Sequence, residues 1–231
     1  DISLREAQRQ VYFGMVGAFL TPYRAGDFPT RASRLKDKSK WMIATVMGLV
    51  GSLIFTIIIV LAALPSAWSW FAGHKGGWLV ILLLTVGKWV VLLLPFVARH
   101  LQRFSWKNEK ARLLIDRLAT MRFGEFTLIV LFTIFRYLCF SVQLWLVMYF
   151  VGVVIPIQDA LLAIPLYYML VTLTPNAPVI DPGIRGSWAM VVFAPYAIAL
   201  PSATLAAIVV WGINTLLPTL VGTSLANSKK V

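Results

Sequence analysis

The apolar residues of this chain gather in long runs that short polar connections separate. Four runs are long enough to cross the roughly 30 Å of hydrocarbon in a bilayer as helices. They cover residues 41–64, 78–98, 126–155 and 203–226. Each run predicts a transmembrane helix. The third is longer than a crossing needs, which predicts tilt, and Pro218 predicts a kink in the fourth.

Three further apolar runs are too short to cross a bilayer, and prolines lie within or beside them. They cover residues 11–20, 160–173 and 188–200. Runs of this length fit re-entrant or broken helices, which occur where protein or water satisfies the freed backbone groups. We therefore expect a re-entrant segment over 9–40 and a pair of broken helices over 160–200. The predicted fold is all-α, polytopic and integral to a membrane.

Two of the helix breaks carry the same phrase. Leu20 to Ser33 reads LTPYRAGDFPTRAS, and Leu173 to Ser187 reads LTPNAPVIDPGIRGS. In each copy proline ends a helix, and an aspartate then precedes an arginine by four positions, on one face of the helix that resumes. Three predicted spans separate the copies, so they enter the membrane from opposite sides. This is the arrangement of an inverted-topology repeat, whose broken helices bind substrate near the bilayer midplane.

Composition and charge support a membrane location. The 231 residues are 59% hydrophobic and 13% charged, whereas soluble domains carry about 25% charged residues. The net charge of +12 gathers in 23–40, 99–125 and the last residues, which places them in the cytoplasm. No soluble basic module with interleaved aromatic residues is present, which argues against nucleic acid as a partner. The connection 99–125 predicts an amphipathic helix on the membrane surface or a solvated linker helix.

Charged and polar residues also lie inside the predicted spans. Lys88, Arg136 and Asn214 each lie within one of these apolar runs. A charge at the centre of a transmembrane helix costs roughly 3 kcal/mol, so such residues face a cavity or a partner. The alternative to a binding site is a structural ion pair between one of these cations and an aspartate of the repeat.

The cations of the membrane region outnumber its acids. The positive residues are Arg24, Arg31, Lys88, Arg136 and Arg185, and the negative residues are Asp27 and Asp181. A buried surplus of positive charge needs an anion or water to offset it, and the planar fork of arginine suits phosphate. We therefore predict a lipid-phosphate site in which Arg136 and Arg185 converge on one cavity.

The chemistry of each group suggests its role in that site. Arg136, Arg185 and Lys88 are predicted to contact the phosphate. Asp27 and Asp181 are predicted to cap the resuming helices and to hold the neighbouring arginines. The hydroxyls of the two Thr-Pro threonines are further candidate contacts.

Metal and cofactor chemistry are not expected. The chain has one cysteine, Cys139, and two histidines, His74 and His100, in separate segments. These residues cannot supply the ligand set of a zinc site, and no glycine-rich nucleotide motif is present. We expect a protein that is not an enzyme. An enzyme acting on lipid phosphates is the minor alternative, with Asp27 and Asp181 as its only candidate bases.

Four segments resemble the flippase-like transmembrane family that is related to the membrane part of lysylphosphatidylglycerol synthases. In chain order they read TPYRAGDFPTR, FRYLCFSVQLWL, LTPNAPVIDPGIRGSWA and WGINTLLP. The chain is most similar to stand-alone members that lack a transferase domain. It differs in having Asp27 and Asp181 where the family pattern has glutamate, and it is expected to lack the first helices of the family.

The resemblance implies lipid binding or translocation in a bacterial inner membrane, without aminoacyl transfer. Together with the charge pattern it predicts translocation or binding of an anionic phospholipid or a lipid-linked phosphate. The alternative is a non-transporting membrane subunit that scaffolds a larger complex. A partner subunit or a homo-oligomer is compatible with either function.

Overall fold

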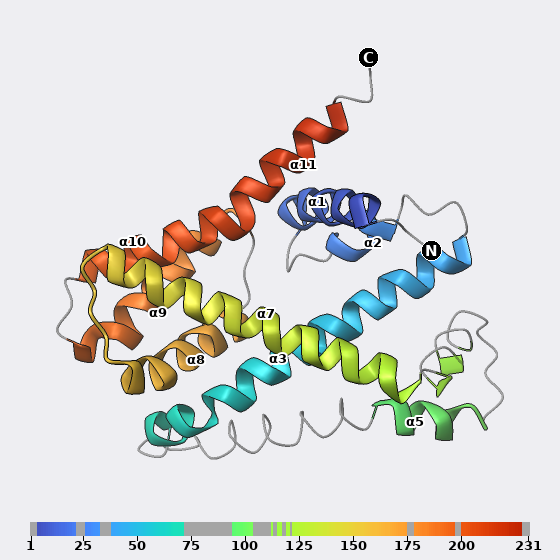
Figure 1. Cartoon of the computed structure of the whole chain (residues 1–231), viewed down its shortest axis with the longest axis horizontal. Helices are drawn as coiled ribbons and strands as arrows, with labels where there is room; N and C mark the ends of the chain where they lie inside the picture. Colours follow the sequence, from blue (N-terminus) through green and yellow to red (C-terminus); the bar gives the residue numbers. More distant parts are fainter. Residues whose placement is uncertain are drawn as a thin grey trace.

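The computed structural model describes most of the chain, and regular structure there is entirely helical. The described ranges are 4–21, 26–32, 38–71, 94–103, 112, 115–116, 119–120, 122–174, 178–196 and 200–227. Within these ranges no strand occurs, which confirms the predicted all-α fold. Figure 1 shows long helices that cross one another, with pairs of shorter helices packed beside them.

Three helices in the described ranges are long and apolar enough to cross a membrane. The first is α3 (Lys38–Phe71), with its apolar part at Val50–Ser69, and the second is α7 (Phe123–Phe150). The third is the last span, which joins α10 (Leu200–Trp211), η3 (Gly212–Leu216) and α11 (Leu217–Asn227). These helices match three of the four predicted spans, as expected of a membrane protein.

The fourth predicted span, 78–98, falls largely outside the described residues. Only its end is described, as the first part of α5 (Leu94–Leu101). The connection that follows does not form the predicted continuous amphipathic helix over 99–125. Instead α5 ends, and the Arg99 Nε donates to the Ala119 carbonyl over 3.3 Å. This bond brings Arg99 of α5 close to Ala119, near the end of the connection.

Proline ends neither the first nor the last span. α3 continues through Pro65 to Phe71 instead of ending at Leu64, because transmembrane helices tolerate the single hydrogen bond that proline removes. The last span stays helical through Pro218, and its irregularity lies just before, in the π turn η3. There the Leu217 N–H donates to the Gly212 carbonyl, one residue further back than in an α-helix.

The α7 helix is shorter at its C-terminus than the apolar run that predicts it. It ends at Phe150 rather than Ile155, because Gly152 adopts a positive φ of 84°. The Gly152 N–H donates to the Tyr149 carbonyl over 3.1 Å, and the next N–H in the chain donates to Met148 over 2.9 Å. These two bonds form the Schellman motif, in which glycine is the favoured left-handed residue.

Each Thr-Pro phrase breaks a helix at the predicted place. In the first copy α1 (Leu4–Leu20) ends before Thr21, and α2 (Asp27–Ala32) resumes. In the second copy α8 (Ile157–Leu173) ends before Thr174, and α9 (Asp181–Phe193) resumes, followed by the 3-10 turn η2 (Ala194–Tyr196). The pair α1–α2 is called the first hairpin, and the pair α8–α9 the second hairpin.

The two hairpins pack near opposite ends of α3 (Figure 1). Near the start of α3, Gly48 lies against the Phe28 ring of α2 with no room for a larger side chain. Near its end, the Ser66 hydroxyl donates to the Leu162 carbonyl of α8 over 2.7 Å. The two hairpins therefore contact α3 at different points along its length.

The last span connects the hairpins in the same way. The α11 helix packs on α1, where Gly222 lies close to the Tyr12 carbonyl. The α10 helix packs on α9, where the Thr204 hydroxyl is 3.4 Å from the Gly186 carbonyl that accepts its hydrogen bond. The first hairpin thus packs on α3 and α11, and the second hairpin packs on α3 and α10.

The main hydrophobic core surrounds α8. Every residue from Ala163 to Val171 is buried, and this segment packs with buried residues of α3, α7, α9 and α10. By contrast, the buried residues of α7 are limited to Tyr137, Leu144 and Met148. Most of the apolar surface of α7 therefore faces outward, as expected of a helix in contact with lipid.

Candidate functional site

A cavity of about 100 Å³ lies where the two hairpins meet the long helices. It draws residues from α1, α3, α7, α8, α9 and the last span. The lining residues are Met15, Phe55, Ile59, Arg136, Phe140, Tyr168, Val171, Thr172, Arg185, Val210, Trp211, Asn214 and Thr215. Segments that are distant in sequence thus line one cavity, which includes two arginines in an otherwise apolar helix assembly.

The two copies of the repeat contribute matching positions to this cavity. Met15 lies six residues before Thr21, and Tyr168 lies six residues before Thr174. The cavity therefore lies at the interface of the copies, where inverted-repeat transporters hold their substrates. The sequence prediction missed both residues, although their fixed distance from the Thr-Pro phrase was a usable signal.

Arg136 and Arg185 line the same cavity, as the sequence predicted. Arg136 comes from α7, and its guanidinium carbon lies 4.5 Å from the centroid of the Phe55 ring and 5.2 Å from that of Phe140. These two rings meet edge to face at 6.1 Å. Cation–π contacts of this kind help to hold a guanidinium in one orientation.

Arg185 comes from α9 and pairs with Asp181 one turn earlier. Its Nε lies 3.0 Å from the Asp181 Oδ1, and the side chains are 19% and 7% exposed. Asp181 is not the N-cap that the sequence predicted, because Ile180 holds that position and its side chain makes no capping hydrogen bond. The charged guanidinium offers the carboxylate a stronger hydrogen bond than a neutral N–H does.

Asn214 lines the cavity from the π turn of the last span. Its side-chain nitrogen donates to the Gln143 Oε1 of α7 over 2.7 Å. This bond joins two membrane helices at the height of the cavity, because both residues lie in mid-span. Asn214 therefore helps to fix the cavity wall as well as lining it, and π turns often occur at functional sites.

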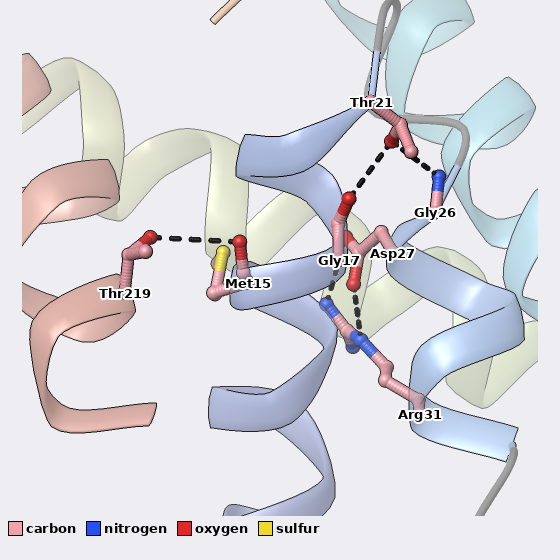
Figure 2. Close-up of polar contacts among 7 residues, drawn as sticks. All are labelled: Met15, Gly17, Thr21, Gly26, Asp27, Arg31 and Thr219. Atoms are coloured by element: carbon pink, nitrogen blue, oxygen red, sulfur yellow. Dashed lines mark hydrogen bonds and ion pairs between the residues drawn. The ribbon is translucent and has the colours of Figure 1, made fainter. Parts of the chain in front are cut away.

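The first hairpin contains the same kind of ion pair, but this pair does not line the cavity. Arg31 Nε lies 2.6 Å from the Asp27 Oδ1, and a terminal nitrogen lies 3.0 Å from the Oδ2 (Figure 2). The guanidinium also lies 5.6 Å from the centroid of the Phe28 ring. Neither Asp27 nor Arg31 is among the residues that line the cavity. Two of the predicted site residues, Arg24 and Lys88, lie outside the described residues.

The threonine hydroxyls stabilise the helix breaks, and neither Thr21 nor Thr174 is among the residues that line the cavity. Thr21 Oγ1 donates to the Gly17 carbonyl over 2.8 Å and accepts from the Gly26 N–H over 2.7 Å (Figure 2). Thr174 Oγ1 donates to the Leu170 carbonyl over 2.7 Å and accepts from the Trp188 indole over 2.8 Å. Each hydroxyl compensates backbone or side-chain groups that its break would leave unpaired.

The charge of the cavity lining favours an anion. Two arginines line it, and the described lining residues include no carboxylate. Asp181 pairs with Arg185 from outside this lining, and the rings of Phe55 and Phe140 lie beside the Arg136 guanidinium. Among the described residues, no three histidine, cysteine or acidic side chains gather into a metal site.

No family model, curated protein or solved structure matches this chain. The function must therefore be inferred from the cavity and the membrane helices themselves. The family resemblance of the repeated phrase stays a prediction.

Proposed function

We propose that this protein binds an anionic lipid by its phosphate group and moves that group across the membrane through the cavity. The observation that carries the proposal is the convergence of Arg136 and Arg185 on one cavity at the interface of the two copies. Guanidinium groups bind phosphate through paired N–H donors. Phospholipids and lipid-linked phosphate carriers present this same group and form the proposed substrate class.

The surroundings of Arg136 favour a lipid over a soluble anion. Arg136 lines the cavity and is also exposed. On the same helix Phe132, Phe135 and Leu138 are 70%, 65% and 51% exposed. A lipid whose phosphate contacts Arg136 can keep its acyl chains on this apolar surface, which a free phosphate ion would not use.

The charge distribution supports an orientation with the basic connections in the cytoplasm, and the resemblance suggests a bacterial inner membrane. The connections 23–40 and 99–125 carry most of the lysine and arginine residues outside the spans. Positively charged loops of this length remain on the cytoplasmic side during insertion. The two copies of the repeat then face opposite leaflets, so the cavity between them is a site that either leaflet can reach in turn.

Lipid translocation by purified protein in vesicles tests the proposal. Vesicles with a fluorescent anionic phospholipid report the fraction of label that an external quencher can reach over time. Arg136→Ala and Arg185→Ala should each lower the translocation rate about tenfold or more, because a hydrogen bond to a charged group contributes about 1.5–3 kcal/mol. Arg185→Lys should retain part of the rate, since it keeps the charge but loses the planar fork.

Arg103→Ala is the matched control, because Arg103 is exposed in the connection after α5. It should translocate lipid at the rate of the unaltered protein. Wild-type rates in both Arg136→Ala and Arg185→Ala, with normal folding, would overturn the proposal. That result would favour the non-transporting scaffold.

A further inference from the structure

The two hairpin arginines occupy different surroundings although their local sequences correspond. Arg185 lines the cavity, whereas Arg31 does not. Both pair with an aspartate four residues earlier, so the ion pair itself does not explain the difference. Some feature outside the repeated phrase must decide which way each arginine points.

The residue seven positions before the Thr-Pro threonine differs between the copies. In the first copy this residue is Gly14 of α1. A side chain there would overlap with Arg31 Cγ and Nε and with the Asp27 Oδ1. The ion pair therefore lies directly against the backbone of α1, in space that only glycine leaves free. Figure 2 shows this pair between α1 and α2.

In the second copy the corresponding residue is Tyr167 of α8. It is 1% exposed, and its ring centroid lies 5.3 Å from that of Tyr168 and 5.7 Å from that of Phe193. The Tyr167 phenol interacts electrostatically with Arg185 and with its aspartate partner. A fixed aromatic ring thus occupies the position that the first copy leaves open.

We propose that Tyr167 is a positioning residue that keeps Arg185 at the cavity. Its ring prevents the Asp181–Arg185 pair from closing onto α8 as the Asp27–Arg31 pair closes onto α1. The guanidinium then presents its N–H edge to the cavity, where a phosphate oxyanion binds. The consequence for transport rests on the proposed function, but the positioning itself does not.

Arginine modification in the full-length protein, held in lipid nanodiscs, tests the positioning. A small arginine-selective dicarbonyl reagent is added, and mass spectrometry gives the modification rate of each arginine relative to exposed Arg103. Tyr167→Ala should slow the modification of Arg185, because the side chain can then fold back onto α8. Tyr167→Phe keeps the ring and removes only the hydroxyl that interacts with Arg185, so it should change that rate much less than Tyr167→Ala does. An unchanged Arg185 rate in folded Tyr167→Ala would overturn the proposal.

The first hairpin provides a second test that does not depend on truncating a buried tyrosine. Gly14→Ala introduces a side chain where the ion pair lies, so it should raise the modification rate of Arg31 and leave that of Arg185 unchanged. Gly51→Ala is the matched control, because a side chain at Gly51 meets no other atom. If Gly14→Ala leaves the Arg31 rate unchanged, this position does not direct the hairpin arginine and the proposal fails.

Inorganic phosphate and the vesicle assay separate this proposal from the proposed function. Phosphate should slow the modification of Arg185 in the unaltered protein and have no effect in Tyr167→Ala. If the unaltered protein shows neither phosphate protection nor lipid translocation, the proposed function fails while the Tyr167 and Gly14 results still decide the positioning. If translocation is normal and Arg185 is equally reactive with and without the Tyr167 ring, the positioning fails and the proposed function stands.

Discussion

The first and second hairpins carry the same phrase, yet they are built into the protein in different ways. Every residue from Ala163 to Val171 of α8 is buried, whereas the buried residues of α1 are Phe13, Gly14, Gly17 and Ala18. The second hairpin is held by large side chains in the core. The first is held by close backbone approach at glycines, because the atoms that contact Gly14 and Gly17 leave no space for a larger residue.

The threonine bonds show the same contrast at the scale of one hydroxyl. Thr21 joins two backbone groups of its own break, whereas Thr174 accepts from the Trp188 ring in the following helix. The same phrase thus ends a helix in both copies, but its surroundings differ. The break in the second hairpin precedes an arginine that lines the cavity, whereas the break in the first hairpin forms a compact turn.

The largest effect should come from removing the aspartates. Asp181→Ala should destabilise the protein by roughly 3–5 kcal/mol, because it leaves Arg185 buried without its carboxylate. Asp27→Ala should cost less, since the Arg31 side chain is 29% exposed and gains water. Denaturant unfolding in detergent measures both. Asp116→Ala is the control, because its pair with Arg112 is largely exposed and contributes little. A larger cost for Asp27→Ala would contradict the contrast between hairpins.

Replacing glycine by alanine should affect the stability of the two hairpins differently, with a smaller effect than the loss of an aspartate. Gly17→Ala should destabilise by about 1–3 kcal/mol, because its new methyl group overlaps with Thr30 and with the Gly26 carbonyl. Gly183→Ala in the second hairpin should be neutral or stabilise by up to about 1 kcal/mol, since open space surrounds it. Thermal unfolding of both variants tests this. Equal destabilisation by the two would show that glycine packing does not set the hairpins apart.

The indole bond of the second hairpin should have a moderate effect. Trp188→Phe keeps most of the ring and removes the donor to Thr174, so it should cost about 1 kcal/mol. Hydrogen exchange should increase around residues 174–188 and stay unchanged at Thr21. Faster exchange in the first hairpin alone would contradict the assignment of this bond.

The smallest effect should be that of Arg31→Lys on lipid translocation. Arg31 does not line the cavity, and lysine can keep the charge pairing with Asp27. The translocation rate should stay close to that of the unaltered protein, whereas Arg185→Lys should lose part of it. Comparable losses in both variants would mean that each hairpin arginine reaches the substrate during transport.

The sequence alone determined the helices, their breaks and the local ion pairs. Hydrophobic run length specifies a membrane helix because every backbone group in hydrocarbon must be paired within the segment. Thr-Pro specifies a break because proline lacks an N–H, and a four-residue spacing specifies the ion pairs because it is one helical turn. The charge surplus also allowed the convergence of Arg136 and Arg185 to be predicted.

Only the tertiary structure decided which copy of the phrase reaches the cavity. The sequence treats Arg31 and Arg185 alike, because both follow an aspartate at the same spacing. Their difference depends on Gly14 and Tyr167, whose effect exists only where a preceding helix packs against the resumed one. The pairing of Asn214 with Gln143, 71 residues apart, likewise depends on how membrane helices face one another. Which side chains pack against each other, and how much space they leave, depends on the packed neighbours, so local spacing cannot specify it.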